Sequence, residues 1–409
     1  MPHYSDTGGS VESNGQRLAR LRARRRWTQQ RLATEAGYSL AAIKAYEQGR
    51  RSLDRSQIVL AFAKVLDCHP TEITGAPFVP VSSDTEGQAA VASVAAVRRV
   101  LLRHGRPARP AEHEVAAVDL AELGRRVAAA NGYRQAASLA RSGAVLPALL
   151  RDLQVACEVS QGDERRQVFA LLTSGYECAM QYLYMLGHTS DATLATERVM
   201  WSARETGDRL RVLAAQWYDA GEFLAIGEHD EAGDIIDDAL TGLGSGQETR
   251  PEAVSLRGAF HLKAALNSAR AADAQTAEQH WVKAKEAAEQ LGEDRNDFQL
   301  QFGPTNVAIW GVSLPVELGN GRVAVDRAEQ VHLPQHFSPE RHSHHYIDVG
   351  RAYFYSGQKD KALGAFLKAE RAAPQVTRMH AGVRETVGTM IRTQKRGDLL
   401  ELGIRLGVV

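Results

Sequence analysis

The stretch between Trp27 and Gly49 constrains the fold of this chain more than any other part of the sequence. Thr28 carries a side-chain oxygen that can cap the start of a helix, and apolar residues with helical spacing follow it. Gly37 predicts the end of this helix, because glycine adopts the left-handed conformation of a helix C-terminus at little cost. The sequence therefore predicts one short helix between Thr28 and Gly37.

A second short helix is expected directly after the turn. Ser39 is its predicted N-cap, and Ala42, Ile43 and Tyr46 can face inward at helical spacing. Gly49 is expected to stop it. Four residues remain on its outer face: Leu40, Ala41, Lys44 and Ala45. Two short helices at a steep angle around a glycine turn form a helix-turn-helix.

The amino-acid sequence of this stretch resembles that of the Xre-type family, which has the fold of the lambda and 434 repressors and of Cro. The resemblance covers about Gly15 to Gly75. It rests on Thr-Gln opening the first helix, Ala-Gly at the turn, Ile and Tyr in the core, and Glu-x-Gly-Arg after the second helix. The resemblance implies a DNA-binding domain whose second short helix lies in the major groove.

The resemblance also implies how DNA contacts are divided among residues. The base-reading positions would be Leu40, Ala41, Lys44 and Ala45. Three of these four are apolar, so they can meet thymine methyl groups but cannot make bidentate hydrogen bonds to guanine or adenine. We therefore expect Lys44 and DNA shape to carry more of the specificity. The expected phosphate-binding residues are Arg25, Arg26, Gln29, Gln30, Arg31, Arg50 and Arg51.

The charge of the chain is unevenly distributed. The 409 residues have a formal net charge of zero. Residues 15–55 hold eleven Arg and Lys against three acidic residues, an excess of eight positive charges that the remainder must balance. A small cationic domain joined to an acidic body is typical of a protein that docks on phosphate. The composition thus supports double-stranded DNA as a partner.

Other site chemistries have weaker support in the sequence. Three well-separated cysteines argue against a disulfide framework or a zinc site and fit a reducing compartment. No run reaches the ~18 apolar residues that cross a bilayer, so we expect a cytoplasmic protein without a membrane partner. Five histidines lie between His332 and His345 and make a metal-dependent enzyme conceivable, although less favoured. We expect no catalytic residues, no metal and no cofactor.

A repeat pattern occupies the second half of the chain. Its clearest copy runs from His345 to Pro374 and includes Gly350, Tyr353 and Phe366. Small residues at such positions let two helices approach closely, and aromatic residues fill the gap between them. Weaker copies place the packing alanine at Ala192, Ala232, Ala277 and Ala324, at longer and less regular steps than the ~34 residues of the tetratricopeptide pattern. This pattern predicts helix pairs stacked as a tetratricopeptide-like α-solenoid.

The prediction is therefore an all-α protein with an N-terminal helix-turn-helix domain and a C-terminal tetratricopeptide-like α-solenoid. We expect a disordered tail at residues 1–14, the DNA-binding domain at 15–75 and a linker at 76–88. Connecting helices and the first solenoid helices should follow at 89–160, and a repeat domain for sensing and dimerisation at 161–409. Residues 383–406 are expected to form the terminal cap of the stack.

This arrangement resembles the RRNPP class of signal-peptide receptors and similar large actinobacterial regulators. It implies a homodimeric, sequence-specific transcription regulator that binds a DNA operator and senses a peptide or small-molecule signal. Aligning the repeats on the clearest copy gives the expected ligand-binding residues on the concave wall: Gln181, Tyr184, Trp217, Asn306, Ile309, His344, Arg351 and Tyr355. The alternatives are a helical body that binds only protein partners or, with less support, a metal-dependent enzyme.

Overall fold

The computed structural model of this protein describes residues 12–103, 110–116, 118–244, 249–394 and 396–409. These residues are helical or irregular and contain no β-strand, so the all-α prediction is confirmed for them. Residues 1–11, most of the expected tail, lie outside the described residues. The chain divides into two compact units: a head unit, Met1–Ala76 with His380–Val409, and a helical stack, Pro77–Met379.

The head unit begins with five short helices around one apolar core. They are α1 (Asn14–Arg24), α2 (Gln29–Ala36), α3 (Leu40–Glu47), α4 (Ser56–Leu66) and α5 (Pro70–Thr74). Their core contains Leu18, Leu32, Ile43, Tyr46 and Phe62, all with no exposed surface. The last helix ends at Thr74, close to the predicted domain boundary at residue 75.

The local signals around α2 and α3 act as predicted. The Thr28 side chain accepts a hydrogen bond from the Arg31 backbone N–H at 3.1 Å, and the Ser39 side chain accepts one from Ala42 at 3.2 Å. Gly37 follows α2 with φ of 72°, in the left-handed region. Both N-caps and the glycine turn are therefore confirmed.

The C-terminal segment groups with the head unit and not with the stack. It forms α22 (Ala381–Thr393) and α23 (Gly397–Leu406), whose apolar faces pack against each other. The sequence pattern places residues 383–406 at the end of the solenoid, whereas here Glu385 and Arg392 bind backbone groups of the head. These hydrogen bonds join the C-terminal segment to the first part of the head unit.

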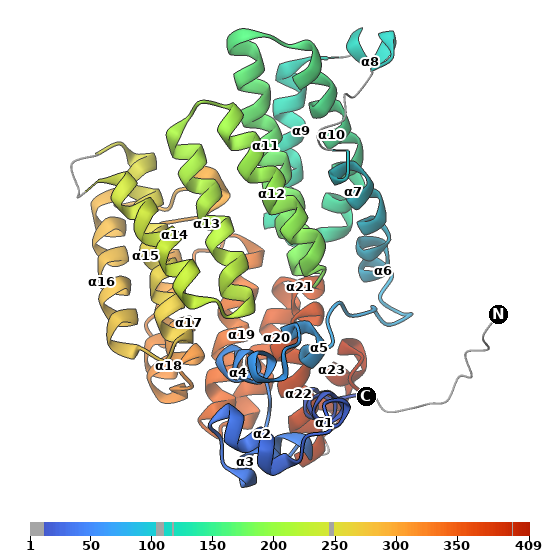
Figure 1. The fold of residues 1–409 in the computed structure, drawn as a ribbon, viewed down its shortest axis with the longest axis vertical. Helices are drawn as coiled ribbons and strands as arrows, with labels where there is room; N and C mark the ends of the chain where they lie inside the picture. Colours follow the sequence, from blue (N-terminus) through green and yellow to red (C-terminus); the bar gives the residue numbers. More distant parts are fainter. Residues whose placement is uncertain (1–11, 104–109, 117, 245–248, 395) are drawn as a thin grey trace, which may run out of the picture. The chain divides into compact units, whose positions relative to one another are not determined.

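The helical stack runs from α6 to α21 (Figure 1). Its first helices are α6 (Thr85–Ala92), α7 (Val94–Leu101), α8 (Glu112–Ala116), α9 (Leu120–Gln135), α10 (Leu139–Val159), α11 (Gly162–Met185), α12 (Thr189–Glu205) and α13 (Arg209–Ile226). It continues with α14 (His229–Leu243), α15 (Pro251–Arg270), α16 (Ala274–Leu291), the short 3-10 helix η1 (Asp297–Gln299), α17 (Pro304–Glu317), α18 (Gly321–Ala328), α19 (Pro339–Tyr355), α20 (Lys359–Ala372) and α21 (Pro374–Met379). The first of these helices begins inside the predicted linker at 76–88, because the Asp84 side chain caps it by accepting from the Gly87 N–H.

Consecutive helices of the stack pack against each other, most extensively α11 with α12, α15 with α16 and α19 with α20. The four alanines of the weaker copies lie on α12, α14, α16 and α18 and are at most 1% exposed. In the clearest copy, a side-chain carbon on Gly350 would lie 2.5 Å from the Phe366 ring. Glycine at this position therefore allows α19 and α20 to approach closely.

The first helices of successive pairs form an inner row. In this row α13 packs on α15, α15 on α17 and α17 on α19, while α9 packs on α11. The last of them, α19, also contacts α9, so the row curves until its two ends meet. Two hydrogen bonds join these ends: Arg134 Nη1 donates to Glu340 Oε2 at 2.8 Å, and Ser338 Oγ donates to the Gln135 carbonyl at 2.9 Å.

The connection between α16 and α17 packs against the inner row. Tyr218 on α13 donates to the Phe298 carbonyl at 3.0 Å, and Gln135 on α9 donates to Gln299 at 3.2 Å. Phe298, Gln299 and Gln301 all have left-handed φ values between 50° and 61°. A non-glycine residue in this region costs of order 1 kcal/mol or more, so the surrounding contacts must hold the segment in place.

Candidate nucleic-acid interface

The two faces of α3 differ in burial as a reading helix requires. Ile43 and Tyr46 are fully buried against the head core. On the opposite face, Ala41 and Lys44 are exposed, and Leu40 and Ala45 are partly exposed. The four predicted base-reading residues therefore share an outer surface of one helix, which offers a single amine and small apolar groups to a partner.

Glu47, near the end of α3, ties the first three helices together. Arg22 on α1 donates through Nε and Nη2 to the two carboxylate oxygens of Glu47, at 2.6 and 2.9 Å. Gln29 on α2 donates to the same carboxylate at 2.7 Å. The Glu47 side chain is only 5% exposed, so this bidentate pair is well shielded from water. The network fixes the angle between α2 and α3.

The network gives Gln29 a role that the sequence did not reveal. The resemblance implies a phosphate contact for this residue, whereas its carboxamide here donates within the protein. Sequence reasoning also missed Arg22 and Glu47 as a structural pair. Their separation of 25 positions shows no local periodicity, so the sequence carries no signal for the pair.

Close backbone packing also fixes α3 against α1. A side-chain carbon on Gly15 would lie 1.9 Å from the Tyr46 carbonyl oxygen, a distance that no side chain can occupy. Gly15 therefore lets the start of α1 lie directly against the end of α3. The buried ring of Tyr46 then packs at 5.8 Å from Phe62 on α4.

The predicted phosphate-binding residues surround α2 and the end of α3 in sequence. Arg25 pairs with Asp67 at 2.9 Å, and the Arg31 guanidinium lies 4.5 Å from the centre of the Trp27 ring. The Arg51 guanidinium lies 5.0 Å from the Tyr46 ring. Arg26, Gln30 and Arg50 are exposed.

Two of the residues expected to contact DNA, Lys44 and Arg50, carry charges that could bind phosphate or bases. In the part of the chain that the structure describes, neither Lys44 nor Arg50 forms an ion pair, and both side chains are exposed. The outer surface of the head thus combines an apolar reading face with cations that are not neutralised by carboxylates.

Comparison with known families supports this description of the head. Residues 15–74 match the helix-turn-helix domain family. The match covers α1 to α5 and supports an Xre-like, DNA-binding helix-turn-helix domain in a regulator. No curated protein matches the chain. Within the described residues, no helix is long and apolar enough to cross a membrane, and no group of three or more metal-ligating side chains occurs.

The residues expected to bind a ligand occupy several environments in the stack. Gln181 donates to the Tyr218 hydroxyl at 3.2 Å, and Trp217 donates to the Ala259 carbonyl at 3.0 Å. Tyr184 is exposed, whereas Ile309 is fully buried and has no surface to offer a ligand.

The later members of this set lie on α17 and α19. Asn306 is 4% exposed, and its Oδ1 has no hydrogen-bond partner among the described residues. Burial lowers the pKa of His344 to about 3, which keeps the imidazole neutral. Arg351 pairs with Glu317 and Asp348 at 3.5 and 3.3 Å, so its charge is already balanced.

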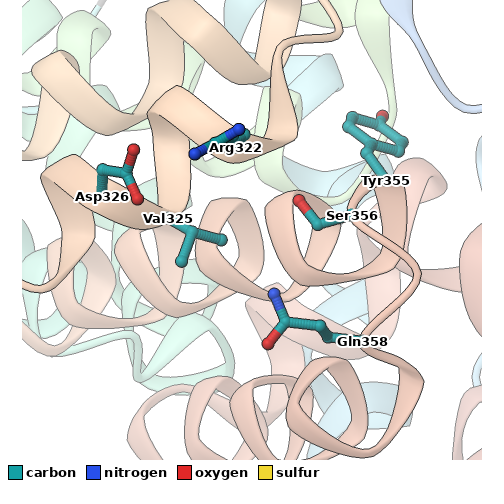
Figure 2. A pocket seen from close by; sticks show the side chains of 6 residues that line it. All are labelled: Arg322, Val325, Asp326, Tyr355, Ser356 and Gln358. Carbon is teal, nitrogen blue, oxygen red and sulfur yellow. The ribbon is translucent and has the colours of Figure 1, made fainter.

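Tyr355, another of the expected ligand residues, lines a hollow in the surface of the stack. Figure 2 shows this hollow, of about 480 Å³, between α18 and the turn that joins α19 to α20. The residues that line it are Arg322, Val325, Asp326, Tyr355, Ser356 and Gln358. Its charged and amide groups suit a polar molecule, but it is an open depression rather than an enclosed site.

A buried polar cluster on the inner row was not found from the sequence. Arg134 has no exposed surface, and its Nε and Nη2 have no hydrogen-bond partner among the described residues. Burial raises the pKa of nearby Glu177 to about 8, so this carboxyl is protonated at neutral pH. Lys263 lies 3.5 Å from the Trp217 ring centre, and burial lowers its pKa to about 7. The cluster consists of Arg134, Glu177, Tyr218 and Glu340.

Proposed function

We propose that this protein is a sequence-specific transcription regulator that binds DNA through α3 and is controlled by a ligand of its helical stack. The observation that carries the DNA-binding part is the outer face of α3. This face exposes Ala41 and Lys44 and is followed directly by the exposed Arg50 and Arg51. A reading helix of this kind lies in the major groove, and arginines at its end bind phosphates on the groove edge.

The chemistry of the face suggests how it would discriminate between sequences. Lys44 is the single cationic residue among the four reading positions and can contact guanine acceptors. Leu40, Ala41 and Ala45 can contact thymine methyl groups. We therefore propose that the protein contacts few bases of its operator directly, and that DNA shape contributes the remaining specificity.

Sensing by the stack is supported by its inner row. Gln181 and Trp217 present a carboxamide and an aromatic ring on neighbouring inner helices. These groups suit a peptide or a small polar signal, and we infer that the paired helices are a tetratricopeptide-like scaffold for it.

A dimer would place two reading helices about one DNA turn apart, ~34 Å, on a near-palindromic operator. A signal can change DNA binding only if it has different affinities for two arrangements of the protein. We propose that the signal changes the spacing of the two heads in a homodimer.

A gel-shift experiment tests the DNA-binding proposal. The probe is a duplex selected from a random-sequence library by the wild-type protein. Replacing Arg50 by Ala should weaken binding to all duplexes and lower the slope of log affinity against log salt by about one. Replacing Lys44 by Ala should also relax the preference for one base position.

Arg125→Ala serves as the control, because Arg125 is 67% exposed on α9 of the stack and lies outside the predicted contacts. Wild-type affinity, slope and preference in both the Lys44 and the Arg50 variants would refute the proposed interface.

A further inference from the structure

The loop between α3 and α4 carries Arg50 and Arg51 and is supported from the far end of the chain. Arg392 on α22 donates through Nε to the Gly49 carbonyl at 3.2 Å, although the two residues are 343 positions apart. The same guanidinium donates through Nη2 to Thr389 at 2.7 Å and to Glu385 at 3.4 Å. The arginine is thus held on its own helix while it binds the loop.

The contact fixes one peptide group at both of its polar atoms. The carbonyl of Gly49 accepts from Arg392, and the N–H of the next residue, Arg50, donates to the Ala45 carbonyl at 2.9 Å. Gly49 has φ of 65°, and a side-chain carbon there would lie 2.7 Å from Arg392 Nε. Glycine therefore provides both the turn and the space for the guanidinium. Fixing this peptide plane limits the directions in which the Arg50 side chain can leave the backbone.

Glu385, seven residues or about two helical turns before Arg392, binds a second part of the head. Its Oε2 accepts from the backbone N–H of Asn14, at the start of α1, at 3.1 Å. It also accepts from the backbone N–H of Leu53, and the Asn14 side chain donates to the Leu53 carbonyl at 2.9 Å. Glu385 is 5% exposed, so these bonds are shielded from water. One carboxylate thereby links α22, the first helix of the head and the loop after α3.

We propose that His380–Val409 is a working part of the DNA-binding head, and that Arg392 is a positioning residue that holds the Gly49–Arg51 loop for phosphate contact. The proposal rests on the proposed function of the head. Glu385 assists by orienting Arg392 and by anchoring α22 to Asn14 and Leu53. Arg392 acts through Arg50 and does not itself touch the DNA.

A double-mutant cycle on the full chain tests this role. The variants are Arg392→Gln, Arg50→Ala and the double substitution, each measured by gel shift on the library-selected duplex at several salt concentrations. We expect Arg392→Gln to weaken binding about tenfold, the effect of ~1.4 kcal/mol, and to lower the salt slope by up to about one. The double variant should bind as Arg50→Ala does, because the arginine that Arg392 positions is already absent.

Matched variants separate positioning from general loss of charge or fold. Arg392→Lys keeps a donor for the Gly49 carbonyl and should restore most of the affinity. Arg396→Gln removes the same charge from the same segment, where Arg396 is exposed and pairs with Asp398 at 2.7 Å, and should bind as the wild type does. Thermal unfolding of each variant identifies any loss of the folded head.

Three outcomes would overturn the inference. Additive losses in the double variant, with a slope lowered by two, would make Arg392 a phosphate contact in its own right. Wild-type binding by Arg392→Gln, while Arg50→Ala binds weakly, would show that the loop needs no support. Equal losses in the glutamine variants of Arg392 and Arg396 would indicate a charge effect. If Arg50→Ala itself has no effect, the proposed function fails instead.

Discussion

Arg134 and Glu340 lie 206 positions apart in the sequence, yet Nη1 of the arginine lies 2.8 Å from Oε2 of the glutamate. The arginine side chain is fully buried and the glutamate side chain is 10% exposed. The pair joins α9 to α19 and therefore holds the two ends of the inner row together.

Replacing Arg134 by Met should destabilise the stack by about 3 to 5 kcal/mol, because it leaves the Glu340 carboxylate buried without its cation. The measurement is urea unfolding followed by circular dichroism. Arg125→Met is the matched control on the same helix: Arg125 is 67% exposed and pairs with Glu122, so its loss should cost at most about 1 kcal/mol. Equal losses in the two variants would contradict a structural role for the pair of Arg134 and Glu340.

Replacing Gly15 by Ala should destabilise the head unit by about 1 to 3 kcal/mol, because the new methyl group would collide with the Tyr46 carbonyl oxygen. Since the contact positions α3, DNA affinity should fall in the same variant. Differential scanning calorimetry of the full chain checks the first effect. Gly132→Ala is the control: Gly132 lies within α9 with no atom within 4 Å of the added carbon, so the substitution should be neutral or stabilising.

Replacing Glu47 by Gln should cost about 2 kcal/mol, because the bidentate ion pair with Arg22 becomes a weaker neutral contact. The angle between α2 and α3 should then vary, and affinity for the selected duplex should fall although position 47 is not a predicted reading residue. Chemical unfolding and gel shift together measure the two effects. Glu122→Gln changes an exposed pair, 2.7 Å from Arg125 on α9, and should leave both quantities unchanged. A Glu47 variant with wild-type stability would show that the network adds nothing.

The stack should lose stability on acidification through a histidine pair. Nδ1 of His261 lies 3.1 Å from Nδ1 of His280. Burial and the neighbouring imidazole lower the pKa of His261 to about 4, and burial also lowers the pKa of His280. The unfolded chain binds these protons near pH 6.5, before the folded chain does, so stability is full above about pH 6.5 and falls as the pH approaches 4.

The expected loss is at most roughly 1.4 kcal/mol for each pH unit and each histidine in that window. Thermal unfolding at a series of pH values measures it. The double variant His261→Gln/His280→Gln should show a flatter pH profile than the wild type, whereas His113→Gln, at an exposed position, should not. An unchanged profile in the double variant would rule out this pair as the source of acid sensitivity.

Local features of the fold could be predicted from the sequence because their causes lie within a few residues. Thr28, Ser39 and Gly37 act on backbone groups at most four positions away, and hydroxyl caps and left-handed glycines have few alternatives. The close fit of Gly350 against Phe366 could also be predicted, since the spacing within one helix pair is fixed by helix geometry.

Contacts between distant parts of the chain could not be predicted in this way. The bond between Arg134 and Glu340 depends on the curvature accumulated over all the intervening helix pairs. Contacts from Arg392 and Glu385 to the head depend on where the chain returns after the stack. For the candidate interface, periodicity separated the outer residues of α3 from Ile43 and Tyr46, but it gave no indication that Gln29 would bind Glu47.

The division of the head unit between both ends of the chain has an architectural consequence. The polypeptide leaves the head unit after Ala76 and re-enters it at His380, so Pro77–Met379 is inserted between the two parts of that unit. The helical stack is therefore joined to the head unit at two junctions, one after Ala76 and one before His380. An exchange of the stack would have to preserve both junctions, and a truncation after Met379 would remove part of the head unit as well.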